Sequence, residues 1–181
     1  GKINFYDAQG NPVKMNNTGI PDGMTAEKVV EDYINAIGGA AKIAMLKDVQ
    51  TTASMQVSVQ SLNVVTWQKG GNKVAMEMGM NGQIFSKRVY DGTTASESGM
   101  GNVRTLEGEE LADLKEQAAF CKEANYATGG YKLALKGVEE VNGSNAYIVE
   151  VERPDGKKTT EYYDMKSSLK VREVSATTGQ D

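Results

Sequence analysis

The clearest pattern of apolar and polar positions lies at residues 72–91 and predicts a β-hairpin. Apolar side chains recur at every second position of its first strand, and they are Val74, Met76, Met78 and Met80. Successive side chains of a strand point to opposite faces, so these four share one face. Asn81-Gly82 follows, and Asn-Gly is typical of a two-residue turn that requires positive φ. Three methionines in a row would make this face soft and adaptable.

The same alternation, with turn residues between the runs, predicts strands on either side of this hairpin. We expect them at 2–7, 51–60, 62–68, 93–98, 131–136, 146–152, 159–165 and 169–174. Asn142-Gly143 and Pro154-Asp155-Gly156 supply tight turns between the later strands. Strands joined by such short turns pair as a meander, so the sheet is expected to be antiparallel.

Helices are predicted at three places. Thr25 is a typical N-cap, and the helix that follows it ends at Gly38-Gly39, where glycine permits a left-handed cap. Its apolar stripe at 3.6-residue spacing comprises Val29, Val30, Tyr33, Ile34 and Ile37. A second, short helix is expected at 40–46. A third is expected after a cap at Thr105, and its apolar stripe comprises Leu111, Leu114 and Ala118.

These elements together predict an α+β fold built on one wide antiparallel sheet. A sheet of roughly eight to ten strands has to curl or close, so we expect strong curvature. Helices that cover its concave face would enclose an apolar cavity. We expect an N-terminal strand and linker at residues 1–23, a single domain at 24–176 and a frayed tail at 177–181.

Composition and charge narrow the possible functions. The chain has 181 residues, of which 39% are hydrophobic and 24% charged, and its net charge is -4 with scattered lysines and arginines. This is typical of a soluble globular protein and disfavours nucleic-acid binding. There is no histidine and a single cysteine, Cys121, which excludes a histidine-based triad, a zinc site with histidine ligands and an internal disulfide. We expect no catalysis, metal or cofactor in this chain.

The methionine-bearing face is the candidate binding site. Methionine repacks easily around different partners, so the face could hold an acyl chain or an apolar peptide. The candidate ligand-binding residues are Met55, Val57, Trp67, Val74, Met76, Met78 and Met80. The alternative is an ordinary hydrophobic core, which would bury the same residues. Trp67 fits a core position and the rim of a cavity equally well.

Other reactive side chains are better explained by structure. Three acids fall in the first turn of the third predicted helix, and they are Glu107, Glu109 and Glu110. They lack the spacing of a calcium loop and suit the first turn of a helix. Asp91 and Asp164 each follow a strand, where aspartate commonly bonds its own turn, although a small hydrolase would use these two. Cys121 could be a reactive thiol, but no histidine is present to act as its base.

Several stretches resemble the C-terminal region of bacterial insulinase-type (pitrilysin-type) zinc peptidases. They are residues 25–39 (TAEKVVEDYINAIGG), 89–92 (VYDG), 106–111 (LEGEEL), 137–147 (GVEEVNGSNAY) and 161–164 (EYYD). The leading segment FYDAQGNPV resembles the end of the preceding peptidase unit and its linker. That region is similar in layout to the lipoprotein-carrier fold, which is called LolA/LolB-like.

The resemblance implies a LolA/LolB-like domain at 24–176, an unclosed half-barrel whose helices plug the mouth. It also implies an exported protein of the periplasm or cell envelope, joined to N-terminal peptidase units. The peptidase motif His-x-x-Glu-His cannot occur without histidine, so no catalytic residue carries over. Carriers of this fold hold acyl chains inside the barrel. Further strands are expected after Val174, and without them an exposed sheet edge could pair with another molecule.

Two functions follow from the resemblance. The first is a non-catalytic accessory domain of an exported zinc peptidase, which binds an apolar ligand, a lipid-modified substrate or a partner surface. The alternative is a free-standing periplasmic carrier of lipids or lipoproteins.

Overall fold

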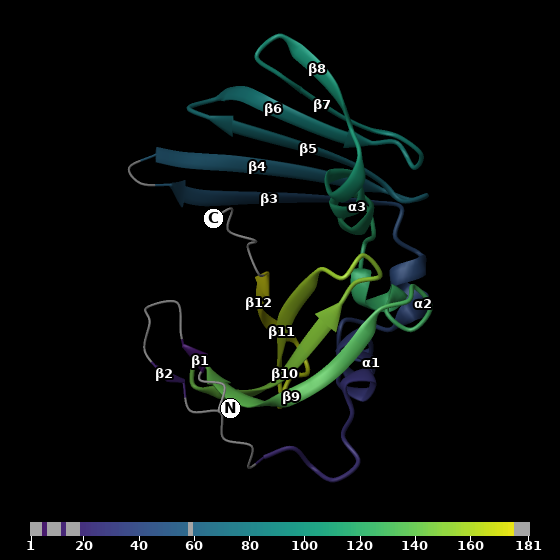
Figure 1. Ribbon diagram of the computed structural model, residues 1–181, viewed down its shortest axis with the longest axis vertical. Helices are drawn as coiled ribbons and strands as arrows, with labels where there is room; N and C mark the ends of the chain where they lie inside the picture. Colours follow the sequence, from purple (N-terminus) through teal and green to yellow (C-terminus); the bar gives the residue numbers. More distant parts are fainter. Residues whose placement is uncertain (1–4, 7–11, 14–18, 58–59, 176–181) are drawn as a thin grey trace. The chain divides into compact units, whose positions relative to one another are not determined.

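Antiparallel strands dominate the computed structural model, which describes residues 5–6, 12–13, 19–57 and 60–175 (Figure 1). The chain divides into two compact units. We call Gly1–Ala40 with Glu123–Asp181 the terminal unit, and Ala41–Lys122 the central unit. The single domain expected at residues 24–176 stays a prediction.

The central unit holds a six-stranded sheet in the linear order β3-β4-β5-β6-β7-β8. Its strands are β3 (Asp48–Val57), β4 (Gln60–Lys69), β5 (Lys73–Met80), β6 (Gln83–Tyr90), β7 (Ala95–Gly99) and β8 (Asn102–Leu106). The terminal unit holds a four-stranded sheet in the order β12-β11-β10-β9. Its strands are β9 (Lys132–Val141), β10 (Ser144–Glu152), β11 (Lys158–Asp164) and β12 (Lys170–Ser175). A separate pair is formed by β1 (Phe5–Tyr6) and β2 (Pro12–Val13).

Every described strand pair is antiparallel and neither larger sheet closes, as predicted. The described strands nevertheless form separate sheets, so the prediction of one sheet with roughly eight to ten strands was wrong. Pairing stops between β8 and β9, where the helix α3 (Gly108–Gln117) and the 3₁₀ turn η1 (Lys122–Asn125) intervene. Alternation identifies strands and their hairpin partners, but it does not show whether two meanders pair across a helix. The predicted covering of a concave face by helices stays a prediction.

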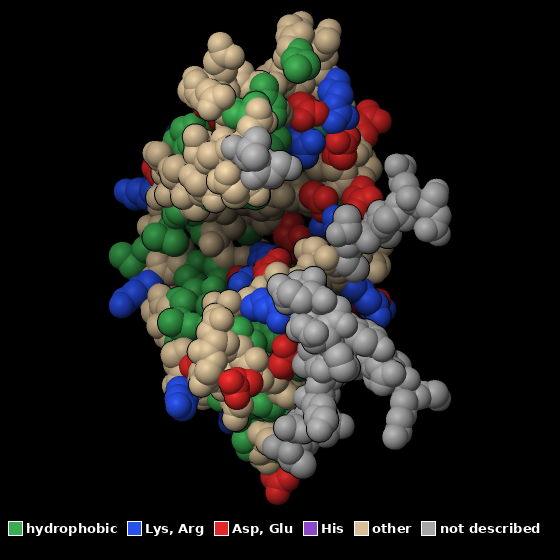
Figure 2. Space-filling model, turned by 90° about the vertical axis from the view of Figure 1, so that its left-hand side faces the viewer, with side chains coloured by type: hydrophobic (Ala, Val, Ile, Leu, Met, Phe, Trp, Pro, Cys, Tyr) green, Lys and Arg blue, Asp and Glu red, His purple; other side chains and the backbone are tan. Residues whose placement is uncertain are grey.

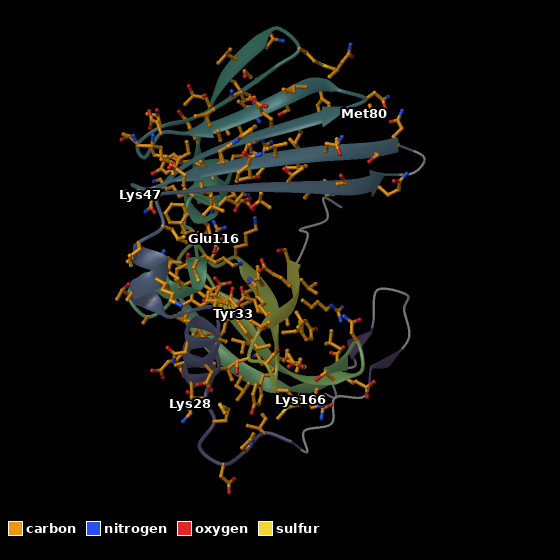
Figure 3. The ribbon with its side chains drawn as sticks, turned by 180° about the vertical axis from the view of Figure 1, so that it is seen from behind. Lys28, Tyr33, Lys47, Met80, Glu116 and Lys166 are labelled. Atoms are coloured by element: carbon orange, nitrogen blue, oxygen red, sulfur yellow. The ribbon has the colours of Figure 1, made fainter. Side chains whose placement is uncertain are left out.

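In the terminal unit, α1 (Ala26–Ala36) packs against the four-stranded sheet. Thr25 caps it as predicted, because its side-chain oxygen accepts a hydrogen bond from the Lys28 backbone N–H at 3.3 Å. Val29 and Val30 are buried in one cluster with the sheet residues Val149 and Tyr163. From this helix Tyr33 also packs edge-on against the ring of Tyr163, with ring centroids 5.4 Å apart (Figure 3).

The predicted stripe of α1 was wrong at its last position. Ile37 is 39% exposed, since it is the C-cap of the helix and its backbone has already left helical geometry. The 3.6-residue spacing therefore no longer sets the direction of its side chain. The short helix α2 (Ala40–Ala44) follows after Gly38 and Gly39, which both have positive φ.

In the central unit, α3 packs against one end of the six-stranded sheet. Leu114 and Ala118 are buried together with a row of sheet residues, which comprises Val74, Tyr90, Ala95 and Leu106. The side-chain amide of Gln68 extends the same row and donates hydrogen bonds to the carbonyl oxygens of Gln117 and Ala119 at 2.7 Å. The expected cap at Thr105 was wrong, because that residue lies in β8 and the helix begins after Glu107.

Candidate functional site

The strand register places the methionines of β5 on one face of the six-stranded sheet. Across β4 and β5, Met80 lies opposite Leu62, Met78 opposite Val64, and Met76 opposite Thr66. Met55 of β3 also lies opposite Leu62, so Met55, Leu62 and Met80 form one row across three neighbouring strands. Side chains opposite each other on one face are close enough to touch. The rows therefore form a continuous, largely apolar surface, which we call the methionine face.

The candidate residues differ in how deeply they are buried. Val74 is 2% exposed and belongs to the core beneath α3, whereas Met76, Met78 and Met80 are half-buried and lie outside that core cluster. Met55 is 47% exposed. Figure 3 shows Met80 at the end of β5, at the opposite end of the sheet from Lys47.

Of the two remaining candidates, one lies on the other face and one is not described. Trp67 lies opposite Ala75, on the other face of the sheet, and is 37% exposed. Val57 is the last residue of β3, and its side chain lies outside the described part of the structure. The structure thus brings together Met55, Met76, Met78 and Met80, next to the buried Val74.

A bulge in β6 makes a hollow beside the methionine face. Met78 pairs with Ser86 and Gly79 with Ile84, so Phe85 is an extra residue on β6. Gly99 on the neighbouring strand β7 is required here, because a Cβ atom at this position would overlap with the carbonyl oxygen of Phe85. The absence of a side chain at Gly99 lets β7 approach the bulged strand closely, and the sequence alone predicted neither feature.

The hollow is a pocket of about 310 Å³ within the central unit. Its lining residues are Phe85, Ser86, Glu97, Gly99, Met100, Asn102 and Arg104. Since Ser86 lies directly opposite Met78, the pocket adjoins the methionine face. Its volume falls at the lower end of the range of roughly 300–1,000 Å³ that small-molecule sites occupy.

The polar wall of the pocket is an ion-pair network. Glu97 Oε1 accepts hydrogen bonds from Ser86 Oγ at 3.0 Å and from Arg88 Nε at 2.9 Å, and its other oxygen pairs with Arg104. Arg104 also pairs with Glu110 of α3 at 2.7 Å. Hydrogen bonds from Arg88 and Arg104 lower the pKa of Glu97 to about 2. The two arginines balance the two glutamates, so the wall carries no net charge.

This arrangement suits binding better than catalysis. Both carboxylate oxygens of Glu97 are occupied by donors, which leaves it a poor general base. The rest of the site is methionine, aliphatic, aromatic and glycine surface, with Thr66 and Asn102 as further uncharged polar residues. A sequence-based signal for the pocket was weak, because Ser86, Glu97 and Arg104 come from three strands and meet only through the pairing register.

A second cluster of reactive side chains is buried in the terminal unit around Glu161, which is 0% exposed. Glu161 Oε1 accepts a hydrogen bond from the Tyr126 hydroxyl at 2.8 Å, and Oε2 accepts one from the Tyr163 hydroxyl at 2.5 Å. Burial, and then the charge of Glu161, raise the pKa of both tyrosines far above its usual value. The hydroxyls therefore stay protonated and act as donors.

Lys170 brings a positive charge into this cluster. Carboxylate oxygens of Glu123, Glu161 and Glu173 lie within 4.8 Å of one another, an arrangement of oxygen ligands that could suit a cation. The Lys170 ammonium lies 2.6 Å from Glu123, 2.7 Å from Glu173 and 3.6 Å from Glu161. A fixed positive charge therefore already occupies the position where an ion would bind.

The aspartates named from the sequence bond their own turns, as predicted. Asp91 accepts hydrogen bonds from the backbone N–H groups of Thr94 and Thr93 at 2.8 Å, and these bonds lower its pKa. Asp164 accepts three hydrogen bonds from Lys166 and Ser167. Glu109 and Glu110 lie in the first turn of α3, as predicted, but Glu107 is the N-cap of that helix, so its predicted place was wrong. Cys121 is half-buried in the segment before η1.

The described surface shows mixed charge. On the face drawn in Figure 2, basic and acidic side chains are interspersed and hydrophobic ones appear among them. Among the described residues, the helices are all too short or too polar to cross a membrane.

Comparisons with known proteins find similar structures but no matching sequence family. A scan against models of protein families gives no match, and a search of curated proteins gives none either. Nothing in the comparisons links the chain to insulinase-type peptidases, so that part of the sequence-based prediction has no support.

Three solved structures illustrate the likeness. A DUF1329 family protein from Desulfovibrio piger is 14% identical with a TM-score of 0.49, and the match covers 82% of this chain and 72% of that one. A LolA superfamily protein from Nitrosomonas europaea is 12% identical with a TM-score of 0.47, over 83% and 71% of the two chains. The lipoprotein LppX of Mycobacterium tuberculosis is 14% identical with a TM-score of 0.38, over 82% and 85%.

Proposed function

We propose that this chain is a non-catalytic binding protein that holds an apolar ligand of the acyl-chain type on its methionine face. This corresponds to the carrier alternative of the sequence analysis, with an exported, cell-envelope setting. The observation that carries the proposal is the register that aligns Met55, Leu62, Val64, Met76, Met78 and Met80 next to the pocket at Ser86.

The chemistry of the surface supports a flexible apolar ligand. Methionine side chains are unbranched and polarizable, so three of them on one strand can adapt to chains of different shape. In the wall of the adjacent pocket the arginines and glutamates neutralise each other. An uncharged ligand can therefore bind there without leaving a protein charge unpaired. The residues of the methionine face on β3, β4 and β5 that the structure describes here, Met55, Leu62, Val64, Thr66, Met76, Met78 and Met80, carry no charge. A bound ligand would be retained there without being changed.

Native mass spectrometry of protein purified without detergent tests the proposal, together with displacement of an apolar fluorescent dye by fatty acids. We expect a co-purifying lipid and competitive displacement of the dye. Met78→Gln, which keeps the side-chain length but adds a polar amide, should weaken dye binding on the order of tenfold. Met45→Gln is the matched control, because Met45 is 77% exposed and lies after α2, away from the methionine face.

Two results would overturn the proposal. One is repeated absence of bound lipid together with no displacement of the dye by fatty acids. The other is an equal loss of dye binding in Met78→Gln and Met45→Gln, which would place the dye elsewhere on the protein.

A further inference from the structure

The hairpin between β7 and β8 has an unusual residue in its turn. Three described hairpins use a two-residue turn in which both residues have positive φ. In two of them the turn is Asn-Gly, at Asn81-Gly82 and Asn142-Gly143, with asparagine φ values of 52° in each. In the third the turn is Met100-Gly101, and Met100 has a φ of 49°.

Methionine gains nothing from this backbone conformation. In the left-handed region its Cβ atom crowds the following carbonyl oxygen, whereas the short polar side chain of asparagine tolerates the same angles. Packing does not compensate, because Met100 is 92% exposed. Turn positions with positive φ prefer asparagine, aspartate or glycine. Because methionine at such a position adds no packing that would stabilise the fold, its presence indicates a function for the side chain.

Other apolar side chains are exposed at the same end of the sheet. Val103 follows the turn on β8 and is 76% exposed, while Ile84 and Phe85 on β6 are 60% and 38% exposed. Gly99, at the base of the turn, touches the backbone of Phe85, so the two strands meet there. Met100 and Phe85 also line the pocket. The apolar tip thus stands at the pocket's edge.

We propose that this tip, formed by Ile84, Phe85, Met100 and Val103, inserts into the apolar layer of a lipid bilayer. A second copy of the chain fits this tip less well than a bilayer does. At exposures of 38% to 92%, the four side chains of the tip offer together about 500 Å², whereas a stable protein interface needs roughly 800 Å² from each partner. Insertion of one or two apolar side chains into a bilayer requires no such flat, extended surface.

The charges near the tip fit a bilayer without net charge. Arg104, the nearest arginine along β8, is paired with Glu97 and Glu110 and is not free to bind acidic lipid headgroups. The proposed occupant is therefore a zwitterionic membrane surface. If the chain carries an acyl ligand as proposed above, the tip would place the pocket beside the membrane from which the ligand comes.

Flotation with phosphatidylcholine vesicles tests this assignment, with Met100→Asn as the decisive variant. The substitution restores Asn-Gly at the turn, so it should fold at least as well as the wild type. We expect its partitioning into vesicles to fall on the order of tenfold, since one apolar side chain no longer leaves water. Met45→Gln removes another exposed methionine and should bind vesicles like the wild type.

The assignment fails if the wild-type chain does not float with vesicles, or if Met100→Asn floats equally well. It also fails if Met100→Asn instead abolishes a dimer seen by sedimentation, because the tip would then contact a second copy. The outcome is independent of the ligand proposal, since vesicle flotation needs no bound dye and dye displacement needs no vesicle.

Discussion

The hydroxyl of Tyr126 donates a hydrogen bond to the fully buried carboxylate of Glu161 at 2.8 Å, across 35 residues of sequence. This contact ties the segment after η1 to the central strand β11 of the four-stranded sheet. A buried carboxylate is costly unless it is paired and hydrogen-bonded, and here both oxygens have tyrosine donors. A positive charge also lies close by, because the Lys170 ammonium is 3.6 Å from Glu161.

Replacement of Lys170 by methionine should destabilise the terminal unit strongly. Although burial alone would lower the pKa of Lys170, the charges of Glu123 and Glu161 raise it, so the ammonium is retained. Its loss would remove the ammonium that pairs with two buried carboxylates, Glu123 and Glu161. We expect a loss of about 3–5 kcal/mol in the free energy of unfolding, measured by denaturant titration with circular dichroism.

Lys166→Met is the matched control for that experiment. Lys166 is exposed in the turn before β12, so its replacement should change stability by less than about 0.5 kcal/mol. Equal effects of the two substitutions would contradict the assigned role of Lys170.

Acid should weaken the central unit through Glu97. Its folded-state pKa of about 2 lies below the value of 4.5 for an unperturbed glutamate. The stabilisation is therefore fully present above pH 4.5 and is lost as the pH falls through about 2. Trp67, the single tryptophan, reports unfolding of this unit. We expect the denaturant concentration at the midpoint of unfolding to decrease over this pH range in the wild type. In Glu97→Gln it should decrease less. Parallel pH profiles would refute the role of Glu97.

The sequence predicted best those strands and turns whose conformation depends on neighbouring residues along the chain. Alternation and the Asn-Gly pairs predicted the hairpin of β5 and β6 and its turn at Asn81-Gly82. The strand β8 was missed because its turn, Met100-Gly101, lacks the asparagine that marks such hairpins. Methionine at the first position of this turn is also the feature from which we infer contact with a membrane.

The parts of the site that were missed depend on contacts between distant residues. Arg104 meets Glu97 only after β7 and β8 have paired in a particular register, and Tyr126 meets Glu161 only after the segment that follows η1 has packed on β11. The bulge at Phe85 shifts the register between β5 and β6 by one residue, and no sequence signal marks it. Period-two alternation does separate Trp67 from the row of Leu62 and Val64, so its place on the other face was available from the sequence.

Gly99→Ala should destabilise the central unit although the backbone there has no positive φ. An added Cβ would overlap with the carbonyl oxygen of Phe85 and push β6 from β7. We expect a loss of about 1–3 kcal/mol, the usual cost of an overpacked site, measured by denaturant unfolding with Trp67 fluorescence. Gly70→Ala is the control, because its Cβ would meet only the Lys47 carbonyl oxygen at 3.6 Å, an ordinary contact.

A side chain that fills the pocket should show whether the ligand uses this space, because the same apolar group can be added elsewhere on the sheet as a control. Ser86→Leu places an isobutyl group in the pocket beside Met78, so dye affinity should fall on the order of tenfold if the ligand uses this space. Glu97 loses one hydrogen bond but keeps those from Arg88 and Arg104, so the network should persist. Ser98→Leu adds the same group on the other face of the sheet, opposite Val103, and should leave affinity unchanged. Undiminished binding in Ser86→Leu would restrict the ligand to the methionine face, because the pocket would then contribute nothing to its affinity.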